Sequence, residues 1–173
     1  MRLQSIIAVA TLLAFTSCAN YKLNYSPEEK QTWQSQFPAD SLELEQTVYV
    51  IGDAGNTSPG QRNPVLSFLQ KKLQDDSQGA VIFAGDNIYE KGLPPKNTGV
   101  LRDEAEAHLK AQLDIVKDHP GRIVFVPGNH DWGYGAPGVE RQENFVDDYL
   151  KRDYDVFVPE NACSEPEVIE LND

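Results

Sequence analysis

The hydrophobic residues of this chain fall into two patterns, short apolar runs and longer segments in which they recur every three or four positions. The short runs are rich in β-branched and aromatic residues and predict buried strands, whereas the longer segments predict helices with one apolar face. Strands are expected at residues 47–51, 80–84 and 122–126. Helices are expected at residues 26–35, from Pro64 onward, at 103–117 and at 139–154. From residue 47 the order is β-α-β-α-β, which predicts an α/β fold with a parallel sheet and helices packed on its faces.

Local signals add to these expectations at two places. Asn63 stands directly before Pro64. Because Asn caps helix N-termini and Pro favours the first helical position, a helix is expected to begin there. The apolar residues within 168–171 are expected to begin a further strand. The sheet is therefore expected to be incomplete within these 173 residues.

The N-terminus has the parts of a bacterial export signal. Arg2 is followed by a hydrophobic stretch of ten residues, too short to span a bilayer, and then by small residues before Cys18. This order resembles the lipobox of bacterial lipoproteins. We expect residues 1–17 to be a signal peptide, Cys18 to carry a lipid that anchors the chain to a membrane of the cell envelope, and residues 18–45 to form a tether and helix. The alternative is a buried N-terminal helix.

The charge and the cysteine count argue against several classes of function. The chain has 15 Lys and Arg against 27 Asp and Glu, a formal net charge of −12. Binding of nucleic acid through the phosphate backbone needs clustered cations, so this charge argues against it. A phosphorylated substrate would need a local positive centre. The chain has 2 Cys and 3 His, which excludes a zinc site with four cysteine ligands and a disulfide framework.

Each of the three predicted strands is followed by glycine and then a residue with a metal-competent oxygen. These pairs are Gly52-Asp53, Gly85-Asp86 and Gly128-Asn129. In an open α/β sheet the carboxyl ends of the strands share one edge, so the three side chains are expected to converge there. Each pair alone is more often a turn or a helix cap. Three in register predict a cation site, because carboxylates gathered without a cation repel one another.

These residues, with their neighbours, resemble a known family. The segments 52–55, 85–89 and 128–131 are similar to the first three motif blocks of the calcineurin-like metallophosphoesterases. Within that superfamily, Gly55 in an Asp-x-Gly motif and Tyr89 after the second Asp resemble the purple acid phosphatase-like branch. The resemblance implies a two-sheet sandwich flanked by helices. Residues 46–173 would be the N-terminal, β-α-β-α-β half of it.

The resemblance also implies a role for each matching residue. Asp53 and Tyr89 would ligate one metal ion, Asp86 would bridge two, and Asn129 would ligate the second. His130 would lie near the phosphate and stabilise the transition state or protonate the leaving alkoxide. The implied cofactor is a pair of divalent or trivalent ions, iron, zinc or manganese. The implied substrate is a phosphate ester, which two cations would neutralise while activating water.

A structural alternative stands beside several of these roles. Tyr89 could be a packing residue, and His130 could cap the following loop. Asn87 could contact substrate, although asparagine in a loop is more often a turn former. Asp131 is expected to orient the loop rather than bind metal. The other two histidines, His108 and His119, are expected to be structural.

One part of the family pattern does not occur in this sequence. The family has further histidine ligands after the third block, whereas no histidine follows His130 here. Without them the remaining oxygen ligands would bind transition metals weakly. Either the chain is the first part of a longer phosphoesterase, and by itself inactive, or it is a non-catalytic lipoprotein module that keeps the scaffold for binding.

Overall fold

The computed structural model describes residues 45–56, 63–162 and 168–171. The chain divides into two units, Met1–Glu43 and Leu44–Asp173, and every described residue belongs to the second. The predicted signal peptide, Cys18 and the helix expected at 26–35 lie outside the described residues. Within the described residues, no helix has the length and apolar character needed to cross a membrane.

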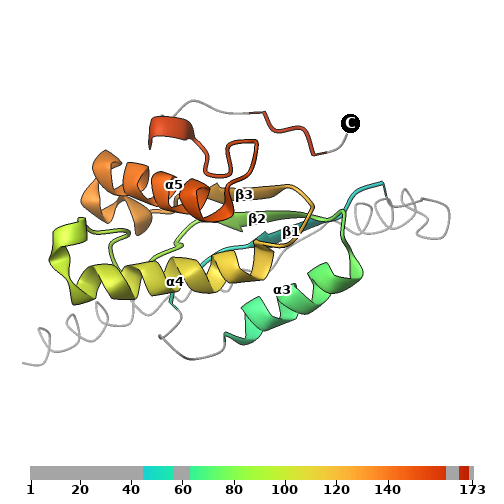
Figure 1. Cartoon of the computed structure of the whole chain (residues 1–173), viewed down its shortest axis with the longest axis horizontal. Helices are drawn as coiled ribbons and strands as arrows, with labels where there is room; N and C mark the ends of the chain where they lie inside the picture. The colour runs from blue at the N-terminus through green and yellow to red at the C-terminus, as the bar shows by residue number, and fades with distance from the viewer. Residues whose placement is uncertain (1–44, 57–62, 163–167, 172–173) are drawn as a thin grey trace, which may run out of the picture. The chain divides into compact units, whose positions relative to one another are not determined.

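The centre of the fold is a three-stranded parallel sheet in the order β1-β2-β3 (Figure 1). The strands are β1 (Val48–Ile51), β2 (Ala80–Ala84) and β3 (Ile123–Val126). β1 and β2 pair in parallel, as do β2 and β3, so all three carboxyl ends meet at one edge. The three predicted strands and the α/β fold class are confirmed.

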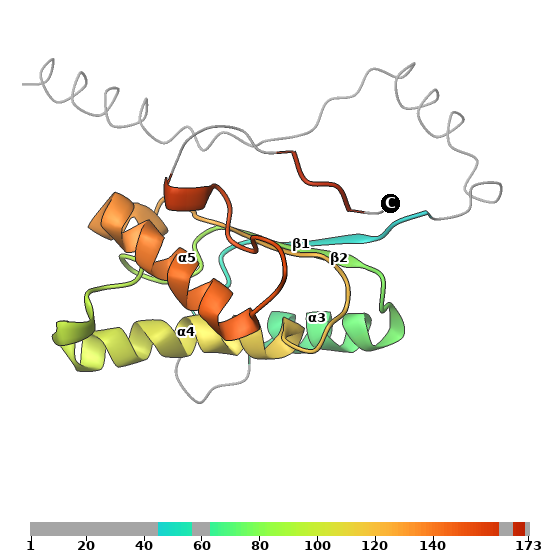
Figure 2. The ribbon, with the colours of Figure 1, turned by 45° about the horizontal axis from the view of Figure 1, so that its top comes forward.

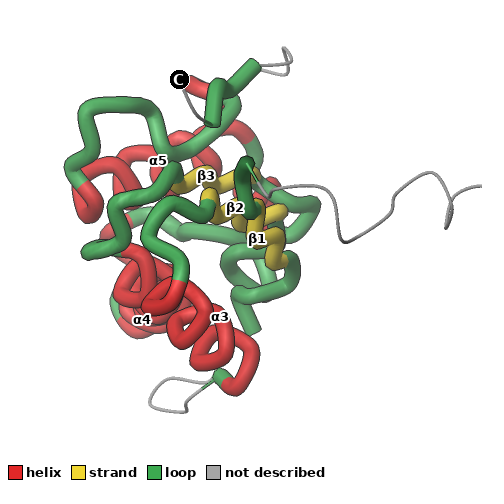
Figure 3. The backbone as a smooth tube through the Cα atoms, turned by 90° about the vertical axis from the view of Figure 1, so that its right-hand side faces the viewer, coloured by secondary structure: helices red, strands yellow, loops and turns green. Residues whose placement is uncertain are grey.

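Within the described residues, α3 (Pro64–Asp75) and α4 (Val100–Val116) connect successive strands, and α5 (Ala136–Leu150) follows β3. Short 3₁₀ turns lie at η1 (Lys96–Thr98), η2 (Asp131–Tyr134) and η3 (Glu160–Ala162). Two views show α3 and α4 side by side on the same side of the sheet (Figures 2 and 3). Right-handed crossovers between parallel strands place helices on a sheet face in this way.

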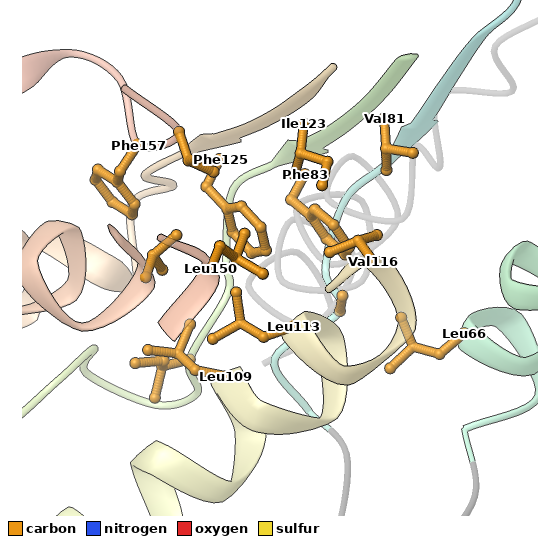
Figure 4. Close-up of a cluster of buried hydrophobic side chains, with 14 of the residues drawn as sticks. Leu66, Val81, Phe83, Leu109, Leu113, Val116, Ile123, Phe125, Leu150 and Phe157 are labelled. Atoms are coloured by element: carbon orange, nitrogen blue, oxygen red, sulfur yellow. The ribbon is translucent and has the colours of Figure 1, made fainter. Parts of the chain in front are cut away.

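The core lies between the sheet and the helices. Alternate strand residues point into it, among them Val81, Phe83 and Phe125, which are fully buried. Figure 4 shows these side chains directed toward Leu113 of α4 and Leu150 of α5. The Phe83 and Phe125 rings stack with centroids 4.2 Å apart. Burying such side chains contributes about 1.5–3 kcal/mol each, and it holds the ends of β2 and β3 side by side.

The observed start of α3 agrees with the prediction from its cap, whereas the bounds of α4 and α5 differ from the predicted ones. The Asn63 side chain accepts hydrogen bonds from the backbone N–H groups of Val65 (2.9 Å) and Leu66 (3.2 Å), so the predicted cap is confirmed. α4 begins three residues earlier than predicted. Its first two residues, Val100 and Leu101, are apolar but exposed, so they do not belong to the buried face from which the helix was predicted. α5 begins and ends earlier because Pro137 occupies its first turn and Lys151 has a left-handed backbone.

The strand expected within residues 168–171 is wrong, since these residues have no regular secondary structure. The outer edge of β3 is instead extended by a single parallel bridge between Phe125 and Phe157. Phe125 N–H donates to the Val156 carbonyl and Val158 N–H donates to the Phe125 carbonyl, each at 2.8 Å. Residues 156–158 therefore make a short buried contact with β3 and do not form a full strand.

Asp147 on α5 faces this extension, and its Oδ1 accepts a hydrogen bond of 3.4 Å from Val156 N–H. Burial raises the pKa of the Asp147 carboxyl to about 6. A carboxyl with a raised pKa in the folded state favours folding while it is protonated. That contribution is present below about pH 4 and is lost as the pH rises through 6.

We therefore predict that Asp147→Asn is more stable than the wild type at pH 7.5, by about 1 kcal/mol once solvent screening is allowed for. At pH 4.5 the two proteins should have nearly equal free energies of unfolding in urea. Asp148→Asn, a change at the neighbouring exposed residue, is the control and should show no such pH dependence. An equal effect of Asp147→Asn at both pH values would contradict this interpretation.

Candidate metal centre

The turns that follow β1 and β2 hold two aspartates next to each other. Asp53 and Asp86 both have a left-handed backbone, with φ of 56° and 54°. Asp and Asn adopt this conformation more readily than most other residues. Backbone hydrogen bonds join the two turns: Asp53 N–H donates to the Gly85 carbonyl (3.1 Å), and Gly55 N–H donates to the Asp86 carbonyl (2.9 Å). The two carboxylates are thus positioned by backbone geometry.

Gly55 permits this close approach. A Cβ atom at this position would lie 2.5 Å from the Asp86 carbonyl oxygen and would overlap the Asn87 carbonyl carbon. No side chain fits there without moving the turns apart. The Asp-x-Gly motif therefore has a physical reason in this chain, because glycine lets the first ligand turn contact the second.

Tyr89 completes a group of three oxygen atoms. Its hydroxyl oxygen lies 2.6 Å from Asp53 Oδ1 and 3.0 Å from Asp86 Oδ2. The hydrogen bond to Asp53, together with partial burial and the Asp86 carboxylate, raises the pKa of the Tyr89 phenol above its usual value. The Tyr89 hydroxyl can therefore donate its proton to either carboxylate. The structure brings together the three residues predicted as ligands from the first two motif blocks.

His130 lies beside this cluster, with its backbone N–H donating to Asp86 Oδ1 (3.0 Å). Its ring centroid is 4.4 Å from that of Tyr89. Ring Nδ1 lies 2.7 Å from the Glu90 carbonyl, which can only accept, so Nδ1 is the donor in this hydrogen bond. The side chain makes no capping hydrogen bond to η2. The alternative of a loop cap is therefore not supported.

Asn129 is the one predicted ligand without a direct contact to the cluster. It is exposed at the turn after β3, and its side chain makes no hydrogen bond within the described part of the chain. The next residue, His130, contacts Asp86 through its backbone, so Asn129 lies at the same edge of the sheet. Its amide oxygen is free to take up a ligand.

Asp131 fastens the turn after β3 to the turn after β2. It is fully buried, and its carboxylate accepts hydrogen bonds from the backbone N–H groups of Gly128 (2.8 Å), Asn87 (3.1 Å) and Ile88 (3.0 Å). Burial raises the pKa of this carboxyl, and the three donors act against that effect. The expectation that Asp131 orients the loop is confirmed.

Asn87, considered above as a possible substrate contact, occupies a buried position. Its side chain is fully buried, and its amide donates to the Val126 carbonyl at the end of β3 (2.8 Å). We assign Asn87 to the junction between the two turns. His119 is likewise structural, since it is buried with its Nε2 2.7 Å from the Gly79 carbonyl.

Two buried glutamines support the same junction and were missed in the sequence. Gln112 of α4 donates to the Asn87 carbonyl (2.8 Å), and Gln142 of α5 donates to the Asp131 carbonyl (3.3 Å). A signal was present, because both glutamines stand at positions where the helical spacing calls for an apolar residue. A buried polar residue at such a position needs a partner, and here it is the backbone of a site turn.

The cluster can be tested for its fit to a metal ion. No group of three or more His, Cys, Asp or Glu side chains that could hold a metal occurs in residues 45–56, 63–162 and 168–171. The convergent donors are instead two carboxylates and a phenol, with the Asn129 amide nearby. Hard oxygen donors of this kind suit manganese, magnesium or ferric iron. The residues therefore fit a cation, although the set has few ligands.

Residues 46–169 match the family model for the calcineurin-like phosphoesterase. The chain belongs to the calcineurin-like phosphoesterase family. Neither the curated proteins nor the solved structures contain a match. Members of this family carry out metal-dependent hydrolysis of phosphate esters and generally bind divalent ions. The oxygen cluster lies within the matched residues, at the sheet edge where an α/β fold binds its ligands.

The close approach of the two turns gives a direct prediction for this phosphoesterase. Gly55→Ala should force the Asp53 turn away from the Asp86 turn. We expect a loss of roughly 2 kcal/mol or more in the free energy of unfolding, measured in urea, and weaker binding of Mn²⁺ by calorimetry.

Gly52→Ala is the matched control, because a Cβ atom there would have no atom within 4 Å. This variant should keep wild-type metal affinity and most of the wild-type stability. If Gly55→Ala behaves like Gly52→Ala in both measurements, the turns do not pack as described.

Proposed function

We propose that this chain supplies the first three motif blocks of a dinuclear metal site that hydrolyses phosphate esters, in the purple acid phosphatase-like branch of its family. The observation that carries the proposal is the Tyr89 hydroxyl, which lies within hydrogen-bond distance of both Asp53 and Asp86. A phenolate beside two carboxylates is a donor set for a strongly Lewis-acidic ion such as ferric iron. Zinc or manganese would suit the second position.

In this proposal Asp53 and Tyr89 hold the first ion, Asp86 bridges both ions, and Asn129 holds the second. The two oxygens of Asp86 support the bridging role, because they face different partners. Oδ2 faces Tyr89, whereas Oδ1 faces the backbone of His130, next to Asn129. When bound, the ions would neutralise the phosphate and activate the attacking water.

His130 handles the proton of the leaving group. With Nδ1–H donating to the Glu90 carbonyl, Nε2 is the ring atom that can take up a proton and pass it to the alkoxide. The Glu90 hydrogen bond orients the ring, as a second partner does for catalytic histidines in general. The position beside Tyr89 keeps this atom near the ester oxygen of a bound substrate.

The cellular setting follows from the N-terminal pattern alone. We propose that residues 1–17 are removed as a signal peptide and that Cys18 is lipidated, so that the enzyme acts at the bacterial cell envelope. No histidine follows His130 in this sequence to complete the ligand set. We therefore expect the 173-residue chain by itself to be inactive.

The test is the metal content and phosphatase activity of the full-length protein. Asp86→Asn should lose bound metal and lower kcat/KM for a phosphate monoester by about 10³-fold, because it removes the bridging carboxylate. Asp103→Asn, on the exposed first turn of α4, is the control and should leave both unchanged.

Full activity and metal content in Asp86→Asn would contradict the assignment. A wild-type protein with neither metal nor turnover would favour the non-catalytic lipoprotein module. The two outcomes are distinct. The first would show that Asp86 is not a metal ligand, and the second would show that the protein is not a metal-dependent enzyme.

A further inference from the structure

A pocket of about 440 Å³ lies directly beside the Tyr89 side chain and has no role in the site described above. One wall is a single face of α4, formed by residues spaced three or four apart. We call the loop after Tyr89 the floor of the pocket and Tyr134 of η2, which also lines it, the opposite wall. The residues that matter most for its chemistry are Tyr89, Lys91, Leu101, Glu104, His108 and Tyr134.

The floor of this pocket is held by two arginines. Arg102 of α4 donates to the Pro94 carbonyl (2.7 Å), and Arg141 of α5 donates to the Leu93 carbonyl (3.0 Å). Arg102 is itself buried and paired with Glu106 at 2.8 Å. Two helices thus fix one short stretch of loop, so the pocket is formed before any ligand binds.

A close backbone contact joins the floor to the opposite wall. Gly92 has φ of +77°, and a Cβ atom there would overlap the Asp131 carbonyl oxygen. The loop after Tyr89 therefore packs against the start of η2, which carries Tyr134. The Arg141 guanidinium lies 5.9 Å from the Tyr134 ring centroid and limits the movement of that ring.

The walls combine apolar surface with the polar side chains of Glu90, Lys91, Glu104 and His108. Leu101 is 60% exposed and Tyr134 is 37% exposed, although both are large side chains that lose free energy by facing water. His108 also differs from a structural histidine such as His119, because its buried Nδ1 has no hydrogen-bond partner in the described residues. A small-molecule site pairs apolar surface with placed polar groups, and this pocket offers both kinds of surface.

We infer that this pocket receives the alcohol part of the phosphate ester, and that it selects a flat apolar group such as an aryl ring. The inference rests on the proposed function. Tyr89 belongs to both the oxygen cluster and the pocket, so the pocket lies within reach of the alcohol part of an ester whose phosphate is held at the cluster. Leu101 and Tyr134 supply the two apolar surfaces that such a ring would contact.

The test compares phenyl phosphate with ethyl phosphate as substrates of the full-length enzyme. Leu101→Ala and Tyr134→Ala should each lower kcat/KM for phenyl phosphate about tenfold and change that for ethyl phosphate less than twofold. Val100→Ala and Trp132→Ala are the matched controls. Both side chains are exposed neighbours of the pocket residues but do not line the pocket. An unchanged ratio of the two substrates in both pocket variants would overturn the inference.

Binding of phenylphosphonate separates this inference from the proposed function. In the wild type, NMR signals of the His108 and Tyr134 rings should shift with phenylphosphonate, and much less with methylphosphonate. If the protein turns over neither ester and contains no metal, the proposed function fails. In that case the NMR shifts alone show whether the pocket binds an aryl group. Their absence would overturn the pocket assignment, even in an active enzyme.

Discussion

The buried carboxylate of Asp131 is the interaction on which the site depends. It accepts three backbone hydrogen bonds, one from the turn after β3 and two from the turn after β2. Removing it would leave those donors buried without partners, at a cost of about 3 kcal/mol or more. Because Asp86 stands directly before Asn87, the position of the central ligand follows from this junction.

This junction explains how an acidic chain can gather its carboxylates. The net charge is −12, and nothing in that charge favours placing Asp53 beside Asp86. Backbone hydrogen bonds between their turns, the Tyr89 proton and the close approach at Gly55 hold them together. A cation would then bind to donors that are already in place, so little conformational entropy is lost on binding.

The sequence predicted the scaffold well because strands and caps depend on local signals. Apolar runs placed the three strands, and the Asn63 cap needed only two adjacent residues. The ligand aspartates were also predictable, since their places after strands follow from topology. The burial of Asn87 and the hydrogen bond of the His130 ring were not, because each depends on a contact about 40 residues away in the chain. The strand expected near residue 168 failed for the same reason, as strand formation needs a partner that an apolar run does not identify.

Backbone hydrogen bonds, rather than a bound ion, position the ligands. Amide hydrogen exchange of the metal-free protein tests this most directly, at Asn87, Ile88 and Gly128 in the wild type and in Asp131→Ala. We predict strong protection of these three amides in the metal-free wild type. We also predict its loss in Asp131→Ala, while the strand amide of Phe125 stays protected. Rapid exchange of the three amides in the metal-free wild type would show that the junction does not hold the ligands in place without an ion.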